Sequence, residues 1–123
     1  MMAWQVALAA AFGAAARYAL DFHLTSRRPW LFPWGTFAVN ISGSLALGLL
    51  VGWVLVQELS PTYQIVLGTG FLGAYTTFST WMLETLRLFE RGARGLALLN
   101  LAGSWAAGTA AAAAGLWFAL AQS

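Results

Sequence analysis

Long apolar stretches, separated by short polar segments, run through the whole chain. Four of them are long enough to cross a membrane as helices, since a spanning helix needs about 20 mostly apolar residues. They cover approximately residues 4–22, 37–56, 63–88 and 96–120. The pattern predicts an all-α integral membrane protein with four transmembrane helices in a single domain, residues 1–123. The first stretch lacks the basic start of a signal peptide and is interpreted as a retained span.

The composition supports lipid as the surrounding solvent. Of the 123 residues 60% are hydrophobic and only 8% are charged, whereas a soluble domain carries about 25% charged residues. There is no cysteine, which excludes disulfides and thiolate metal sites. No catalytic constellation and no glycine-rich phosphate loop is present, so the chain is not expected to be an enzyme.

The arginines between the predicted spans lie on one side of the membrane. Arg27 and Arg28 follow the first span, and Arg87, Arg91 and Arg94 follow the third. Two spans separate these loops, so both loops share a side. The positive-inside rule places them in the cytoplasm and both termini outside.

Small and polar residues recur at every fourth position of two spans, which places them on one helix face. The rows are Thr36, Asn40, Ser44 and Gly48 in the second span, and Asn100, Ser104, Gly108 and Ala112 in the fourth. The glycines and alanines are interpreted as helix-packing positions. Asn40 fits either packing or a polar path through the protein, because intramembrane amides need partners.

The third span combines glycines with hydroxyl groups. Gly68, Gly70 and Gly73 precede the run Ala74–Trp81, which holds four serine or threonine hydroxyls. One interpretation is a helix broken near mid-membrane, where the freed carbonyls of Gly73 or Thr76 hold a hard cation. The other is an unbroken helix whose hydroxyls bond back one turn. Physical reasoning alone leaves both open.

Three further side chains are open to two interpretations each. The positive ring edge of Phe78 suits a small dehydrated anion, although a packing or lipid-facing role is equally compatible with the sequence. Arg17 either pairs within the membrane or extends to its surface. Glu84 is expected to form a structural pair with Arg87 or Arg17.

Three groups of residues resemble the Fluc (CrcB) fluoride channels, and the match runs through all four spans. They are Gly13-Ala14-Ala15-Ala16-Arg17-Tyr18, Trp34-Gly35-Thr36 with Asn40-Ile41-Ser42-Gly43-Ser44, and Gly70-Phe71-Leu72-Gly73 with Thr76-Thr77-Phe78-Ser79-Thr80 and Glu84. The resemblance implies a passive, fluoride-selective channel in the bacterial plasma membrane that lets toxic fluoride leave the cytoplasm. It also implies an antiparallel dimer of four-helix subunits with two pores near the interface.

The resemblance assigns roles to individual positions. A structural sodium ion at the dimer interface would be held by the carbonyls of Gly73 and Thr76. Asn40 would be the pore asparagine, and Arg17 matches the family's basic residue of the first span. The residues that the resemblance places along the fluoride pore are Asn40, Phe78, Trp81, Ser104, Thr36, Thr77 and Thr80.

Two positions depart from the family pattern. Position 81 is Trp81 instead of phenylalanine, which keeps a ring edge and adds an indole N–H. Position 100, where some members have tyrosine, is Asn100. The one-sided arginines also leave two assemblies open: a homodimer that tolerates the bias, which we favour, and a heterodimer with an oppositely oriented homologue.

Two other classes of function were weighed. A small multidrug-resistance-type, proton-coupled exporter also has four spans, but it would want an acid deep in the first span, and Asp21 lies at that span's end. A structural membrane adaptor without a pore would leave the mid-span hydroxyls without a use, although polar groups in lipid are costly.

Overall fold

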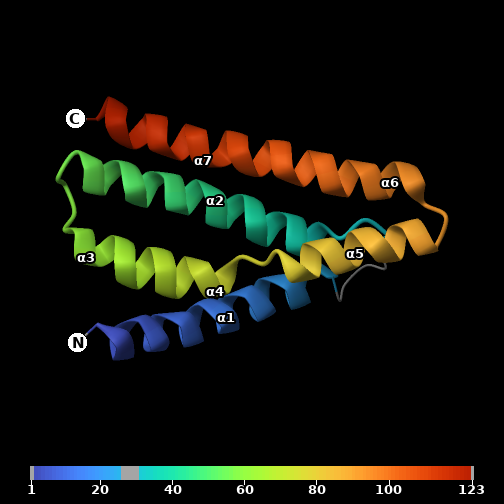
Figure 1. Ribbon diagram of the computed structural model, residues 1–123, viewed down its shortest axis with the longest axis horizontal. Helices are drawn as coiled ribbons and strands as arrows, with labels where there is room; N and C mark the ends of the chain where they lie inside the picture. Colours follow the sequence, from blue (N-terminus) through green and yellow to red (C-terminus); the bar gives the residue numbers. More distant parts are fainter. Residues whose placement is uncertain (1, 26–30, 123) are drawn as a thin grey trace.

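The computed structural model describes residues 2–25 and 31–122. Within these ranges every regular element is helical, and the elements form four segments that run alternately up and down (Figure 1). The termini lie at one end of the molecule, together with the turn between the second and third segments. The predicted topology signals Arg27 and Arg28 lie outside the described residues.

The first two segments are single helices. Helix α1 spans Ala3–Thr25 and helix α2 spans Trp34–Leu55. The second segment begins directly after Pro33, which agrees with the tendency of proline to precede a helix rather than interrupt one.

The third segment contains several short elements. It begins with α3 (Pro61–Tyr63), where the Ser60 hydroxyl accepts from the Thr62 N–H at 3.3 Å and Pro61 stands at the first helical position. The π-helix η1 (Gln64–Leu72) and α4 (Gly73–Tyr75) continue it. Helical geometry then stops, and α5 (Ser79–Glu90) resumes the segment.

The fourth segment comprises α6 (Arg94–Leu98), the π-helix η2 (Leu99–Gly103) and α7 (Ser104–Ala121). The sequence pattern predicted neither π-helical stretch. Such turns are rare and frequently lie at functional sites.

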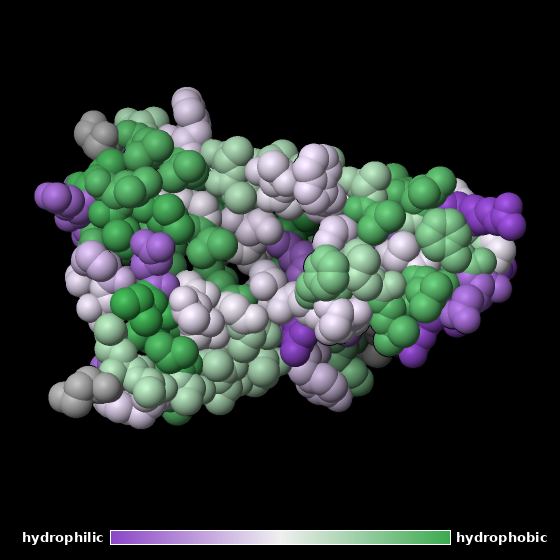
Figure 2. Space-filling view, in the orientation of Figure 1, coloured by the Kyte–Doolittle hydropathy of each residue, from purple (hydrophilic) through white to green (hydrophobic). Residues whose placement is uncertain are grey.

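Two continuous stretches, Trp34–Leu55 and Arg94–Ala121, are long and apolar enough to cross a membrane. Large apolar side chains cover the outside of the molecule, as Figure 2 shows over much of one face. Trp4, Phe12 and Trp117 are examples, and Trp117 is 70% exposed. Soluble monomers rarely expose so much contiguous apolar surface, so this surface suits lipid.

Glycines allow the two polar rows to pack together at their apolar ends. A Cβ on Gly48 of α2 would collide with the backbone carbonyl of Ala112 in α7, and one on Gly115 would collide with the carbonyl of Leu45. The backbones of α2 and α7 therefore approach more closely than side chains would permit. The helix-packing interpretation of the glycines in these rows agrees with this geometry.

Gly48→Ala is therefore expected to destabilise the protein. Its methyl group must displace the backbone of α7, and overpacking of this kind costs roughly 1–3 kcal/mol. Thermal unfolding in detergent measures the effect. Gly95→Ala is the matched control, because a Cβ there meets no atom within 4 Å. Equal melting temperatures for the two variants would contradict the close approach.

Candidate functional site

A cavity of about 450 Å³ lies between the second, third and fourth segments. Figure 2 shows the surface hollowed near the middle of the molecule. Polar groups reach the cavity from all three segments, although most of its wall is apolar. Its polar and aromatic lining residues are Asn40, Ser44, Thr76, Thr77, Phe78, Trp81, Ser104, Trp105 and Thr109.

The interruption of the third segment forms part of the cavity wall. Helix α4 ends at Tyr75, and Thr76 is extended, with φ −81° and ψ 161°. Thr77 and Phe78 precede α5, which begins at Ser79. A segment that leaves helical geometry frees peptide groups from their usual partners, and these groups need new ones where water is excluded.

Asn40 supplies two of those partners. Its Nδ2 donates to the Thr77 carbonyl at 2.9 Å, and its Oδ1 accepts from the Thr77 N–H at 2.8 Å. One side-chain amide on α2 thereby satisfies both polar groups of one peptide residue at the interruption. Since an amide NH₂ has two protons, a second Asn40 N–H is left for another acceptor.

The same arrangement removes the normal donors from two backbone carbonyls. In a continuous α-helix the N–H of Thr77 would donate to Gly73 and that of Thr80 would donate to Thr76. Here the Thr77 N–H donates to Asn40, and the Thr80 N–H donates to the Thr77 hydroxyl at 3.2 Å. The carbonyls of Gly73 and Thr76 therefore lose their helical donors, and both residues line the cavity.

Hydroxyl groups complete the ends of the interruption. The Thr76 hydroxyl donates to the Leu72 carbonyl at 2.9 Å, so it bonds back one turn. The Thr77 hydroxyl, by accepting from Thr80, caps the first turn of α5. Thr76 bonds back along the preceding turn, as expected for an unbroken helix. Thr77 supports the turn that follows, as expected for a broken one.

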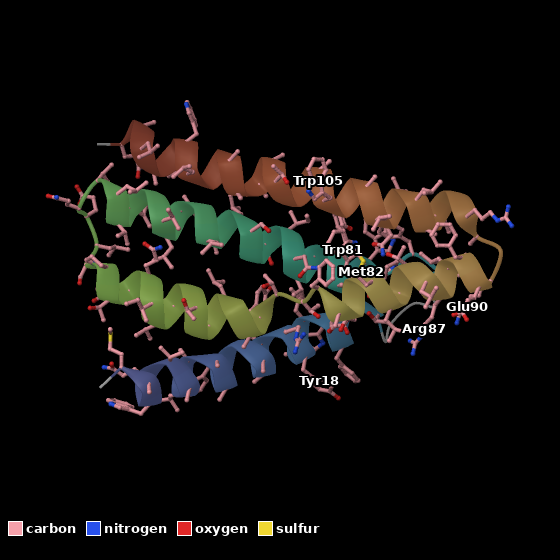
Figure 3. All side chains as sticks on the ribbon, viewed as in Figure 1. Tyr18, Trp81, Met82, Arg87, Glu90 and Trp105 are labelled. Carbon is pink, nitrogen blue, oxygen red and sulfur yellow. The ribbon has the colours of Figure 1, made fainter. Side chains whose placement is uncertain are left out.

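Two aromatic rings lie beside the interruption. Phe78 and Trp81 meet edge to face, with centroids 5.7 Å apart and an interplanar angle of 88°. Phe78 is 70% exposed. The Trp81 indole N–H donates to the Asn100 carbonyl at 2.9 Å, which ties α5 to the fourth segment. Figure 3 shows Trp81 on the side of α5 that faces that segment.

Asn100 is completely buried, with 0% of its surface exposed. Its Nδ2 donates to the Thr85 hydroxyl at 2.8 Å, and its Oδ1 accepts from the Ser104 hydroxyl at 3.3 Å. The two positions that depart from the family pattern, 81 and 100, are therefore in direct contact. The sequence analysis treated them separately.

The remaining predicted site residues lie at two smaller cavities. Arg17, Thr36, Thr77 and Thr80 line one of about 220 Å³ together with Tyr18; the tyrosine points away from the other segments (Figure 3). Glu84 lines another of about 160 Å³. Thr77 borders both the 450 Å³ cavity and the Arg17 cavity, so the interruption lies between the two spaces.

The expected pairing of Glu84 is not found in the subunit. Within the described residues no ion pair joins it to Arg17 or Arg87, and its Oε1 is buried without a hydrogen-bond partner. The Glu84–Arg87 spacing of three residues permits a contact on a helix surface. Glu84 and the exposed Arg87 line the same cavity without forming an ion pair.

Two contacts near the cavity were not predicted from the sequence. Thr85 donates from its hydroxyl to the Trp81 carbonyl at 2.9 Å. The hydroxyls of Ser42 and Tyr75 lie 2.9 Å apart and share a hydrogen bond. Thr85 follows Trp81 by one helical turn, a spacing that could have indicated the first contact. Nothing in the sequence pairs Ser42 with Tyr75.

Four helical segments with an apolar outer surface, around a cavity that several polar side chains reach, are typical of a small helical membrane protein with an internal polar site. The chain belongs to the CrcB family: the family described as "CrcB-like protein, Camphor Resistance (CrcB)" matches residues 4–116. The protein is accordingly a membrane protein.

Relatives with curated names support the same assignment. The chain is 49% identical over 119 residues to "Fluoride-specific ion channel FluC 1" of Streptomyces avermitilis, covering 96% of each chain. It is 48% identical over 118 residues to a protein of that name from Symbiobacterium thermophilum, covering 94% of this chain and 95% of the relative. "Fluoride-specific ion channel FluC 2" of Mycobacterium tuberculosis is 44% identical over 114 residues, covering 93% and 87%. These names describe ion channels, in agreement with the expectation that the chain is not an enzyme.

Asn40→Leu is expected to lower stability, because the N–H and carbonyl of Thr77 lose their partners. Each buried group left unsatisfied costs about 1–3 kcal/mol. Thermal unfolding in detergent gives the change, and Gln64→Leu, which replaces an exposed amide on η1, is the control. A melting temperature unchanged by Asn40→Leu would show that Asn40 does not support the interruption.

Proposed function

We propose that this chain is a fluoride-selective channel that carries fluoride passively out of the cytoplasm, across the bacterial plasma membrane, and so lowers fluoride toxicity. It crosses the membrane four times, and the interruption in its third span lies near mid-membrane. The observation that carries the proposal is the polar cavity beside that interruption, where Asn40 holds Thr77 and aromatic edges stand next to hydroxyl groups.

Fluoride needs hydrogen-bond donors because it is small and strongly hydrated. A pore must replace its water with groups that carry positive partial charge, and the lining of the 450 Å³ cavity contains no acid that would repel an anion. The second Asn40 N–H and the positive ring edge of Phe78 are such groups. Trp81 contributes only its ring, because its indole N–H already donates to the backbone carbonyl of Asn100.

The smaller Arg17 cavity extends the route. Thr36 and Thr80 supply hydroxyls there, and the positive charge of Arg17 offsets the negative charge of Asp21, which lines the same cavity. Thr77 borders both spaces, so an ion that passes the interruption moves from one set of donors to the other. Ser104 lines the 450 Å³ cavity and is the proposed pore residue of the fourth span.

A sodium ion fits the carbonyls of Gly73 and Thr76. Hard cations prefer carbonyl oxygens, and these two have lost their helical N–H donors to Asn40 and Thr77. Two carbonyls are too few for such an ion, so a second subunit must add its own pair. When bound, sodium supplies a fixed positive charge at the dimer interface.

An antiparallel dimer gives the exposed groups around the cavity a partner. Phe78 is 70% exposed and Trp105 is 66% exposed, and both line the cavity. A second copy in the opposite orientation would cover them and close the cavity against lipid. We favour the homodimer, although the one-sided arginines also fit a heterodimer with an oppositely oriented homologue.

Phe78→Ile should reduce fluoride efflux from vesicles that contain the purified chain. The substitution removes the positive ring edge, and contacts of aromatic edges contribute about 0.5–1.5 kcal/mol, so we expect a decrease of about two- to tenfold. A fluoride electrode measures the efflux, with chloride efflux recorded beside it. Phe118→Ile, which makes the same change on α7 away from the cavity, is the control.

Unchanged fluoride efflux in Phe78→Ile would remove that ring from the pore. Lack of any flux from the well-folded chain reconstituted alone would count against the homodimer. Efflux that requires a proton gradient would favour the proton-coupled exporter instead.

Removing sodium should weaken the dimer. Dialysis into N-methyl-D-glucamine leaves the carbonyls of Gly73 and Thr76 without their cation, and the monomer fraction on a sizing column should rise. Readdition of sodium should reverse the change, whereas equal ionic strength from the organic cation should not. A dimer fraction independent of sodium would contradict the proposed ion site.

A further inference from the structure

The buried contacts of Asn100 join α5 to the fourth segment. Asn100 has 0% exposure and Ser104 has 6%, so water does not compete for their hydrogen bonds. The Asn100 amide lies between the Thr85 hydroxyl at 2.8 Å and the Ser104 hydroxyl at 3.3 Å. Of these three residues only Ser104 lines the 450 Å³ cavity.

The direction of each hydrogen bond in this chain of contacts follows from the number of protons available. The Thr85 hydroxyl has one proton and donates it to the Trp81 carbonyl at 2.9 Å. Its oxygen can therefore only accept from Asn100, which must turn its NH₂ toward Thr85. The Oδ1 of Asn100 then faces Ser104, and Ser104 must donate its single proton to it.

The hydrogen bond to Asn100 determines what Ser104 offers to the cavity. Because the Ser104 hydroxyl donates its hydrogen bond to Asn100 Oδ1, its oxygen presents only lone pairs to the cavity. Lone pairs repel an anion, so a fluoride ion at this wall must replace Asn100 Oδ1 as the acceptor of the Ser104 hydrogen bond. The amide oxygen and the anion thus compete for one hydrogen bond.

We propose that Asn100 is a positioning residue that weakens fluoride binding at Ser104 by holding the Ser104 proton, and that Thr85 sets the orientation in which it does so. This proposal rests on the proposed function. The competition keeps the ion from being held too tightly, which a conducting pore requires, since binding must also allow release.

Thr85→Val tests the orientation without changing the cavity lining. Valine keeps the shape of threonine but cannot accept from Asn100, so the amide turns and the Ser104 proton becomes available to fluoride. The fluoride concentration that gives half-maximal efflux should fall by about two- to tenfold, the usual effect of one hydrogen bond. Thr85→Ser keeps the hydroxyl and should restore the wild-type value. Thr69→Val, on the exposed face of η1, is the matched control.

Asn100→Leu is the second variant, and it keeps the test decisive if Thr85→Val does not fold. It removes the competing amide oxygen while the Trp81 indole keeps its bond to the backbone carbonyl of residue 100. It should lower the half-maximal concentration in the same direction. Efflux is normalised to the amount of folded dimer, because a purely structural role would alter that amount and leave the half-maximal concentration unchanged.

Combination with Ser104→Ala separates action through Ser104 from other effects. In that background neither Thr85→Val nor Asn100→Leu should shift the half-maximal concentration. A shift that persists without the Ser104 hydroxyl would overturn the proposal, as would unchanged values in both folded single variants. If the wild-type chain carries no fluoride either alone or together with an oppositely oriented homologue, the proposed function itself fails. If it conducts and the variants match it, only the role of Asn100 is refuted.

Discussion

An interrupted helix in a membrane protein must find partners for its peptide groups inside the protein, because lipid offers none. In this chain the N–H and carbonyl of Thr77 need such partners, and one side chain supplies both. Asn40 both donates to and accepts from that residue, at 2.9 and 2.8 Å. The opening of the third segment, the cavity beside it and the donor-deprived carbonyls of Gly73 and Thr76 all depend on this pair of hydrogen bonds.

The second and fourth segments pack closely at one end and line the cavity at the other. At Gly48 and Gly115 the backbones of α2 and α7 approach closely. At Asn40 and Ser104 the same faces diverge and border the cavity. Packing at one end therefore fixes the distance across which the polar groups act at the other. The hydrogen bond from the Trp81 indole to the Asn100 carbonyl joins α5 to the fourth segment beside this space.

The sequence predicted the helical segments well, because apolar length and flanking prolines determine them locally. It also indicated a change of geometry after Gly73, where glycines meet hydroxyls. It did not show that Asn40 supports Thr77, since the two are 37 positions apart and only packing brings them together. Among the described residues Glu84 forms no ion pair, although Arg87 lines the same cavity, because a spacing of three residues permits such a contact without enforcing it.

Amide hydrogen exchange at Thr77 tests the central claim most directly, measured by NMR in the wild-type protein and in Asn40→Leu. Leucine makes the surroundings drier, so faster exchange cannot come from added water. If Asn40 holds the interruption, Thr77 should be protected in the wild type, although it lies outside any helix, and should exchange at least about tenfold faster in the variant. Equal exchange rates at Thr77 in the two proteins would contradict the account.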